Sequence, residues 1–301
     1  MFRFLLQRKP QAWDLIGDIH GHAAQLEKLL TSLGYTSKRR VWSHPERKAL
    51  FLGDYINRGP DIRRTVDLVR AMVEHGFAEA LLGNHEHNAL IYEAHEGKNL
   101  PPKFARQLQT TQQAYAGKRK AWSTALGFFL SLPVCIEKRG FRAVHACWSS
   151  RAIQTLGFLK HLQPEDLTRP ESPRARAIHL LLNGPEIAAP PEVAPEKVER
   201  RYRIQWWRGD SPGWADAGYP VQQDLKNSRI SSEASKAFLP YSHRQPPLFF
   251  GHYGFAKPPE PIAPHLCCLD LAVSRGGSLA AYRWDGEKAL LKDKCITAKA
   301  R

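Results

Sequence analysis

The fold is decided by one stretch of sequence, Ala12-Trp13-Asp14-Leu15-Ile16-Gly17-Asp18-Ile19-His20-Gly21, in which an apolar run ends in a polar cluster flanked by glycine. Three further clusters follow apolar runs in the same way: Gly53-Asp54-Tyr55-Ile56-Asn57-Arg58-Gly59, Gly83-Asn84-His85-Glu86 and Gly251-His252. Short apolar runs bounded by glycine are typical of buried strands, and ligand-binding residues in α/β sheets gather beyond the strands' carboxyl ends. The clusters are therefore expected to meet at one edge of a sheet.

The first third of the sequence alternates between strand and helix patterns. Residues 12–16, 49–52 and 79–82 are predicted strands. Apolar residues at helical spacing predict helices after the first two of them, up to Gly34 and Gly76. Strand, helix and strand joined by short turns predict a parallel sheet.

The later sequence changes in character. Residues 95–125 are polar and predicted to be helical, whereas 150–245 are irregular and contain Pro185, Pro190, Pro191 and Pro195. Strands are predicted again at 141–144 and 248–250. The last part is predicted to be antiparallel, with hairpin turns at Gly276-Gly277 and Asp285-Gly286 and strands at 269–273, 279–284 and 289–291. We expect one α/β domain over residues 10–301, with insertions at about 95–135 and 150–245, the second forming a cap or lid.

Composition limits the class of protein. The 301 residues include 44 Lys and Arg against 29 Asp and Glu, a formal net charge of +15. This excess fits either a solvated basic surface or a polyanionic partner such as a nucleotide, a nucleic acid, a phosphoprotein or an anionic membrane. The five cysteines are odd in number and form no C-x-x-C pair, which indicates a reduced protein. The first residues lack a signal-peptide pattern and no apolar run approaches a membrane span, so a cytoplasmic location without membrane insertion is expected.

The polar clusters offer the side chains that a pair of divalent metal ions needs. Carboxylates, imidazoles and one amide oxygen all follow predicted strands. Alone, each would more often have a structural role, but together they indicate a dinuclear metal centre that activates water for attack on phosphorus. The candidate ligands are Asp18, His20, Asp54, Asn84, His145 and His252.

The first three clusters closely resemble the phosphoprotein phosphatase family of calcineurin-like metallophosphoesterases, which includes Ser/Thr phosphatases and symmetrical diadenosine tetraphosphatases. The resemblance is specific over residues 12–90, fair at 141–148 and 248–285, and absent between. It implies a two-sheet β-sandwich flanked by helices. It also implies that Asp18 and His20 bind one metal, that Asp54 bridges, and that the other three ligands bind the second metal. Arg58 would hold phosphoryl oxygens, and His85 would protonate the leaving group.

The sequence departs from this family at Asn57, because the protein phosphatases have Asp there, paired with the catalytic histidine. An amide can still orient His85, but it cannot stabilise the imidazolium by charge, so the pKa of His85 should be lower. General-acid help matters most for poor leaving groups such as a serine alkoxide. Asn57 therefore favours phosphoanhydrides or other activated esters, unless it is simply a tolerated change.

A second arginine of the family precedes the last histidine, and Arg208, Arg229 and Arg244 are candidates for it. Arg208 also follows Trp206-Trp207, which could stack a base or, more simply, lie in the core.

Two hypotheses of different classes follow. The first is a hydrolase that uses two divalent ions, expected to be Mn²⁺ although Fe, Zn, Ni or Co suit the same ligands, and that cleaves phosphate monoesters or phosphoanhydrides of phosphoproteins or dinucleoside polyphosphates. The alternative is a weakly active or inactive member that binds nucleotide or nucleic acid through its basic surface. The sequence leaves the substrate, the metal and the oligomeric state open.

Overall fold

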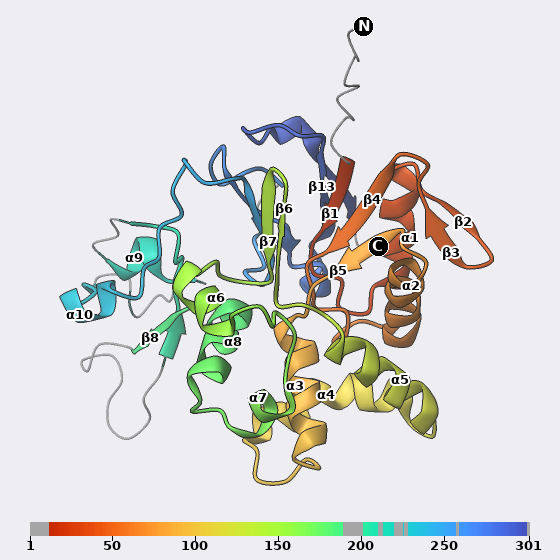
Figure 1. Ribbon diagram of the computed structural model, residues 1–301, viewed down its shortest axis with the longest axis horizontal. Helices are drawn as coiled ribbons and strands as arrows, with labels where there is room; N and C mark the ends of the chain where they lie inside the picture. Colours follow the sequence, from red (N-terminus) through yellow and green to blue (C-terminus); the bar gives the residue numbers. More distant parts are fainter. Residues whose placement is uncertain are drawn as a thin grey trace, which may run out of the picture.

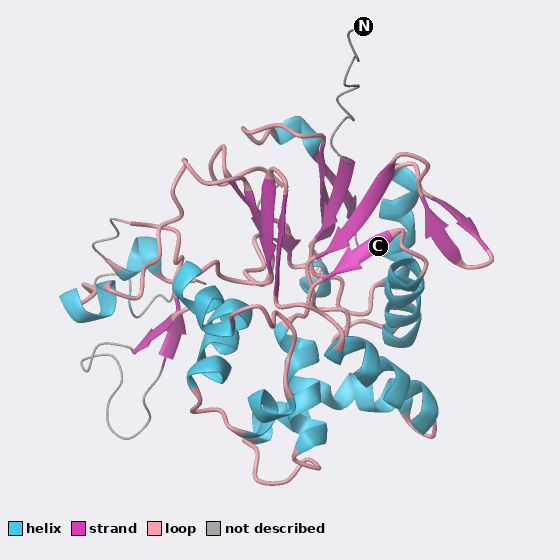
Figure 2. Ribbon diagram, in the orientation of Figure 1, coloured by secondary structure: helices cyan, strands magenta, loops and turns pink. Residues whose placement is uncertain are grey.

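Two β-sheets packed face to face form the centre of the computed structural model, and helices cover their outer sides (Figure 1, Figure 2). The structure describes residues 12–188, 201–209, 213–219, 225, 228–256 and 259–299. This architecture confirms the predicted two-sheet sandwich flanked by helices.

The larger sheet has six strands, and β1 lies at its middle. β1 pairs in parallel with β4 and antiparallel with β13, while β5 extends the parallel side next to β4. β12 and β14 both pair antiparallel with β13. The bounds are β1 Ala12–Ile16, β4 Arg47–Phe51, β5 Ala78–Ala80, β12 Asp270–Leu271, β13 Ser278–Trp284 and β14 Cys295–Lys299.

The smaller sheet has four strands in the order β11-β10-β7-β6. β10 pairs in parallel with both β11 and β7, and β6 closes the edge antiparallel to β7. The bounds are β6 Cys135–Lys138, β7 Phe141–Val144, β10 Leu248–Phe250 and β11 Leu266–Cys268.

Alternation along β1 explains why the two sheets stack. Trp13 and Leu15 point into the cluster between the sheets, where they meet Phe141 and Phe249 of the smaller sheet. Ile16 faces the opposite side and belongs to the cluster under the helices. Because successive strand residues point to opposite faces, a run that is apolar on both faces must be covered on both.

The helices fall into three groups. α1 (Ala23–Ser32) and α2 (Ile62–Glu74) cover the outer face of the larger sheet. α3 (Asn84–Ala94), α4 (Pro102–Tyr115) and α5 (Arg119–Leu130) gather at the lower edge in Figure 1. The third group contains α6 Ser150–Leu156, α7 Pro164–Thr168 and α8 Pro173–Asn183. The remaining short elements are the helices α9 Trp214–Ala217 and α10 Ser232–Ser235 and the strands β2 Thr36–Lys38, β3 Val41–Ser43, β8 Glu186–Ala188 and β9 Arg201–Arg203.

Two predictions about the chain need correction. The predicted antiparallel pairing across Gly276-Gly277 is present, but the first strand ends at Leu271 rather than Val273, because Val273–Arg275 form a 3-10 helix. Residues 289–291 do not form the next strand. Leu290 donates its N–H to Pro264 O instead, and the strand that pairs with β13 begins only at Cys295. The segment from 150 is also more regular than predicted, because α6 and α8 pack together and Ser149 and Ser172 cap them. Pro190, Pro191 and Pro195 lie outside the described residues.

Candidate metal centre

The six predicted ligands come together at the carboxyl ends of five strands. β1 delivers Asp18 and His20, and β4, β5, β7 and β10 deliver one ligand each. A cavity of about 390 Å³ is lined by five of them: Asp18, His20, Asp54, Asn84 and His252. The sixth, His145, is fully buried just beneath, with Nε2 3.0 Å from Asn84 Oδ1. The chain therefore brings into one place all of the residues that the strand-end pattern singled out.

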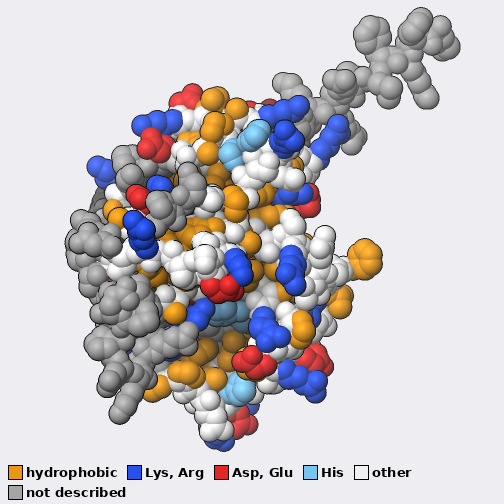
Figure 3. All heavy atoms as spheres, turned by 90° about the vertical axis from the view of Figure 1, so that its left-hand side faces the viewer, with side chains coloured by type: hydrophobic (Ala, Val, Ile, Leu, Met, Phe, Trp, Pro, Cys, Tyr) orange, Lys and Arg blue, Asp and Glu red, His pale blue; other side chains and the backbone are white. Residues whose placement is uncertain are grey.

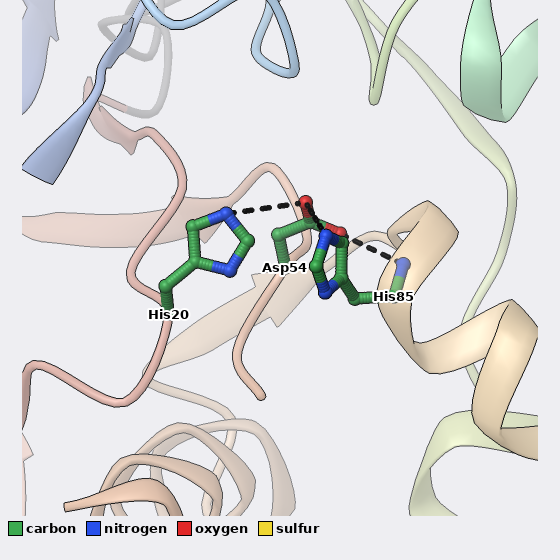
Figure 4. A group of neighbouring side chains, drawn as sticks. All are labelled: His20, Asp54 and His85. Atoms are coloured by element: carbon green, nitrogen blue, oxygen red, sulfur yellow. Dashed lines mark hydrogen bonds and ion pairs between the residues drawn. The ribbon is translucent and has the colours of Figure 1, made fainter. Parts of the chain in front are cut away.

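Asp54 lies at the middle of this arrangement, between two groups of histidines. Its Oδ2 lies 3.5 Å from His20 Nε2 and 3.8 Å from His85 Nε2, as Figure 4 shows. Its Oδ1 lies 3.4 Å from His145 Nε2, and His252 completes this second group. Within each group the potential ligand atoms all lie within 4.8 Å of one another. One carboxylate thus serves both groups, one through each oxygen.

The buried histidines present lone pairs to this carboxylate. His145 Nδ1 donates to Leu52 O at 2.8 Å, and His20 Nδ1 donates to Ile56 O at 3.1 Å. In the neutral ring the proton is then on Nδ1, so Nε2 is left as an acceptor. Hydrogen-bond acceptors therefore face each other at two places. Nε2 of His145 faces Oδ1 of Asp54, and Nε2 of His20 faces Oδ2 of Asp54. A cation between such atoms removes their repulsion.

Two further observations fit a bound cation. His252 Nδ1 lies 2.9 Å from Asn84 Oδ1, so this nitrogen faces the other candidate ligands, and the buried Nε2 has no hydrogen-bond partner among the residues that the structure describes. Asp18 is almost completely buried, and its pKa is raised well above the usual value by burial first and then by the charges of Asp270 and Asp54. Burial also lowers the pKa of His20 and His252, which keeps these rings neutral and able to bind metal. The donor set therefore suits two divalent ions.

Glu86 holds the loops that carry the ligands. Its carboxylate accepts hydrogen bonds from the backbone N–H groups of Gly83, Asp54, Tyr55 and Ile56, at 2.8 to 3.1 Å. Burial, followed by the charge of Asp54, raises the pKa of Glu86 to about 8, and the N–H donors oppose this rise. Glu86 thereby ties the loop after β4 to the loop after β5, and both of its carboxylate oxygens accept backbone hydrogen bonds.

Several ligands adopt a backbone conformation that is unusual for residues with a side chain. His20, Asp54 and His252 have φ values of 47°, 57° and 70°, and Asn57 and Arg58 both have 68°. Left-handed backbone of this kind costs free energy and persists where the surrounding structure enforces it. These loops therefore aim their side chains into the cavity at the expense of local stability.

Arg58 and His85 also reach the cavity. Arg58 Nη1 donates to His20 Nε2 at 2.9 Å, and Nη2 donates to His85 Nε2 at 3.2 Å. Burial lowers the pKa of His85 well below its usual value. The guanidinium therefore lies beside the group formed by His20, Asp54 and His85, where a phosphoryl oxygen could replace its contacts to the two rings.

Asn57 contacts the Nδ1 side of the His85 ring, opposite the Nε2 atom that Arg58 contacts. Its side-chain amide lies 2.7 Å from His85 Nδ1 and 2.6 Å from Thr111 Oγ1, and its backbone N–H donates to Thr111 Oγ1 at 3.1 Å. A hydroxyl both donates and accepts, so Thr111 can bind the amide in either orientation. Asn57 is fully buried and Thr111 is 1% exposed. A helix of the first predicted insertion, α4, therefore holds the residue that orients His85.

The structure does not bring Arg208 to the cavity. Arg208 is exposed and donates from Nε to Gln205 Oε1 at 3.3 Å, and neither Arg229 nor Arg244 lines the cavity. Arg201, Arg203 and Arg275 line it instead, and sequence reasoning missed them. The alternating Arg201-Tyr202-Arg203 triplet, which forms β9, was the available signal.

Trp206 and Trp207 belong to the core rather than to the cavity. Trp206 is fully buried and donates from Nε1 to Ala146 O at 3.0 Å, while Trp207 packs against Phe250 and Tyr253. The packing therefore supports a position in the core for Trp206 and Trp207, and not stacking on a base.

Comparisons with known proteins show which family the chain belongs to. A sequence model of the calcineurin-like phosphoesterases matches residues 14–208. A bis(5'-nucleosyl)-tetraphosphatase PrpE [asymmetrical] from Oceanobacillus iheyensis is 33% identical over 108 residues, which is 36% of this chain and only 42% of that protein. A similar PrpE from a Geobacillus species is 37% identical over 103 residues, 34% of this chain and 40% of that protein.

Among solved structures, a Saccharomyces cerevisiae protein serine/threonine phosphatase aligns with a TM-score of 0.51 at 14% identity. The alignment covers 98% of this chain and 82% of that one. This likeness supports the fold alone. Because the family match extends over more than half of the chain, the protein belongs to the calcineurin-like phosphoesterase family.

Proposed function

We propose that the protein hydrolyses phosphate esters or phosphoanhydrides with the help of two divalent metal ions, Mn²⁺ being the first to test. The observation that carries the proposal is the position of Asp54, whose two oxygens face two separate groups of histidines. When bound, the metal ions would polarise the phosphoryl group and lower the pKa of a water molecule. The family and the complete set of six ligands support this reading.

The residues around the ions have separate tasks in this reaction. Arg58 binds phosphoryl oxygens through its planar guanidinium, from the position where it now contacts His20 and His85. His85, oriented by the Asn57 amide, supplies a proton to the departing oxygen. A bond forms between the water oxygen and phosphorus as the bond from phosphorus to the leaving oxygen breaks. The leaving oxygen takes a proton from His85, and the proton that the water loses passes to the solvent.

The substrate class proposed first is a dinucleoside polyphosphate. Two PrpE relatives carry that activity in their names, although the matches span less than half of those proteins. The lowered pKa of buried His85 also favours an anhydride substrate, because only a small fraction of the His85 side chain is protonated at neutral pH. A phosphate leaving group, with a second pKa of about 6, needs far less protonation than a serine alkoxide.

Further features of the proposal concern the whole chain. We place residues 10–301 in one phosphoesterase domain that works in the cytoplasm, with residues of the second insertion closing over the cavity. Glu186, Arg201 and Tyr219 from that insertion line the cavity and support this part. Among the described residues no helix is both long and apolar enough to cross a bilayer.

The proposal is tested by turnover on p-nitrophenyl phosphate, diadenosine tetraphosphate, ATP and a phosphoserine peptide, each with Mn²⁺ and with EDTA. Asp54→Asn should lose activity on every substrate. Asp293→Asn, the same change at an exposed turn residue, should keep it. Turnover that survives EDTA or Asp54→Asn would refute the metal-dependent mechanism, and the preferred substrate would decide between anhydride and ester.

One observation favours the alternative of a nucleic-acid-binding protein. A cavity of about 940 Å³ beside α2 is lined by Arg39, Arg40, Arg63, Arg64 and Arg70, although Glu27, Asp61 and Asp67 also line it. Figure 3 shows a different face from the one that carries α2, and there histidine side chains are visible among Lys and Arg side chains with Asp or Glu side chains beside them. Binding of a fluorescent oligonucleotide that falls steeply with salt and persists in Asp54→Asn would support this alternative.

A further inference from the structure

A second and larger cavity adjoins the metal centre. It has a volume of about 740 Å³, and four residues line both cavities: Arg203, Tyr219, Ala272 and Arg275. Because these four residues line both cavities, the two spaces are neighbours, and Arg203 and Arg275 lie at the rim where they meet. Volumes of about 300–1,000 Å³ are typical of pockets that enclose a small organic ligand.

The wall of the second cavity is partly aromatic. Tyr219, Tyr253 and Phe255 line it, with ring centroids 5.1 Å apart for Tyr219 and Phe255 and 5.6 Å for Tyr219 and Tyr253. Tyr219 is fixed because its hydroxyl donates to Gly254 O at 2.9 Å. Tyr253 is buried and Arg203 lies over its ring, so the partly exposed rings of Tyr219 and Phe255 are the ones that can contact a planar group such as a nucleobase.

The same cavity is lined by cations without a matching carboxylate. Arg203 and Arg275 line both cavities, Lys299 lines only the second one, and no acidic residue of the described chain lines this second space. The metal-centre cavity, in contrast, contains Asp18, Asp54, Asp270 and Glu186. A ligand that passes from the first cavity into the second therefore meets positive charge along its path, as a chain of several phosphates requires.

The two rim arginines are held by the fold. Arg203 Nη1 donates to His252 O at 3.0 Å, its guanidinium lies 5.4 Å from the centre of the Tyr253 ring, and its buried Nε has no partner among the described residues. Arg275 Nη2 donates to Gly254 O at 3.4 Å. Gly254 allows this approach, because a Cβ there would lie 2.2 Å from Arg275 Nη2. Arg203 thus keeps an unused donor at the boundary of the two cavities.

We propose that the second cavity binds the nucleoside polyphosphate portion of the substrate that extends beyond the phosphorus under attack. The inference rests on the proposed function and makes it more specific. Arg203 and Arg275 bind the phosphates next to the scissile bond, Lys299 binds the far end of the phosphate chain, and the aromatic wall contacts the base. A short substrate such as p-nitrophenyl phosphate does not reach Lys299.

The test changes residues that line only the second cavity and leaves the rim intact. Lys299→Glu reverses the charge, and Thr297→Trp fills the space from an exposed position on β14. Lys288→Glu is the matched control, because Lys288 is exposed and lines none of the cavities described above. We expect kcat/KM for diadenosine tetraphosphate relative to p-nitrophenyl phosphate to fall about tenfold in the first two variants, chiefly through KM, and to stay constant in the control.

A binding measurement separates failure of this inference from failure of the proposed function. Calorimetric titration with ATP in EDTA needs no turnover, and the dissociation constant should rise about tenfold in Lys299→Glu but not in Lys288→Glu. An unchanged kcat/KM ratio together with unchanged ATP affinity would overturn the inference even if the wild type is active. If Lys299→Glu lowers kcat/KM relative to p-nitrophenyl phosphate for a phosphoserine peptide but not for diadenosine tetraphosphate, the inference would be overturned in favour of a peptide-binding cavity. A wild type that binds ATP through Lys299 but hydrolyses nothing would leave the inference supported and the hydrolase refuted.

Discussion

Two adjacent threonines on α4 allow a direct test of how His85 is positioned. Thr111 Oγ1 contacts both the side-chain amide of Asn57 and its backbone N–H, and both residues are buried. Thr110 Oγ1 accepts a hydrogen bond from the Arg58 N–H at 3.0 Å, but Thr110 is exposed. The pair therefore offers the same substitution, to valine, in two environments.

The expected cost differs because only one site is sealed from water. Thr111→Val leaves two buried polar groups of Asn57 without a partner, and each such loss costs about 1–3 kcal/mol. We expect the free energy of unfolding to fall by about 2–4 kcal/mol. In Thr110→Val water can replace the hydroxyl, so a loss within about 0.5 kcal/mol is expected.

Urea unfolding in EDTA measures the loss of stability, and kcat on diadenosine tetraphosphate measures how well His85 is still positioned. Thr111→Val should lower kcat about ten- to a hundredfold, because a catalytic group that is displaced by about 1 Å loses that much. Thr110→Val should keep most of its kcat. Equal losses of stability in the two variants would refute the argument from burial, and a full kcat in Thr111→Val would refute the positioning of His85 by way of Asn57.

Three further results are expected. Asn57→Asp should raise the pKa of His85 and so increase turnover of a phosphoserine peptide relative to diadenosine tetraphosphate, and an equal change on both substrates would contradict this. His87 is buried with a pKa lowered to about 4, so its native form stays neutral while the unfolded chain binds a proton below about pH 6.5, and stability falls with falling pH. His87→Leu should therefore reduce the loss in unfolding free energy between pH 7 and pH 4.5 by about 2 kcal/mol, and a pH dependence equal to that of the wild type would be the contrary result. Adding Mn²⁺ at 100 times its dissociation constant to EDTA-treated, dialysed protein should raise the unfolding free energy by about 2.7 kcal/mol for each ion bound, with no gain in Asp54→Asn.

The sequence is most informative where local signals and the fold agree. The apolar runs before Gly17, Gly53 and Gly83 predicted three strands of the parallel part, and glycine positions predicted the ends of α1 and α2. The candidate ligands could be picked out for the same reason, because each of them lies a few residues beyond a strand.

Contacts over long sequence distances could not be predicted in this way. Thr111 is 54 residues from Asn57, and nothing in the pattern of α4 marks one of its threonines as a partner of the loop after β4. The arginines at the rim were missed because Arg203 and Arg275 come from distant segments that only the folded chain brings together. Strand β14 was placed too early because Leu290, an apolar residue in a plausible strand, packs between the sheets instead.

The carboxylate of Glu86 has a consequence for the choice of metal. By joining the loops after β4 and β5 through four backbone groups, it fixes how far Asp54 can move from Asn84. A centre whose width is set by the protein scaffold cannot expand to suit a larger ion. Discrimination among divalent ions should then follow ionic radius: Ca²⁺, which prefers oxygen distances of about 2.3–2.6 Å, would be excluded by geometry even when it is far more abundant than the smaller transition-metal ions.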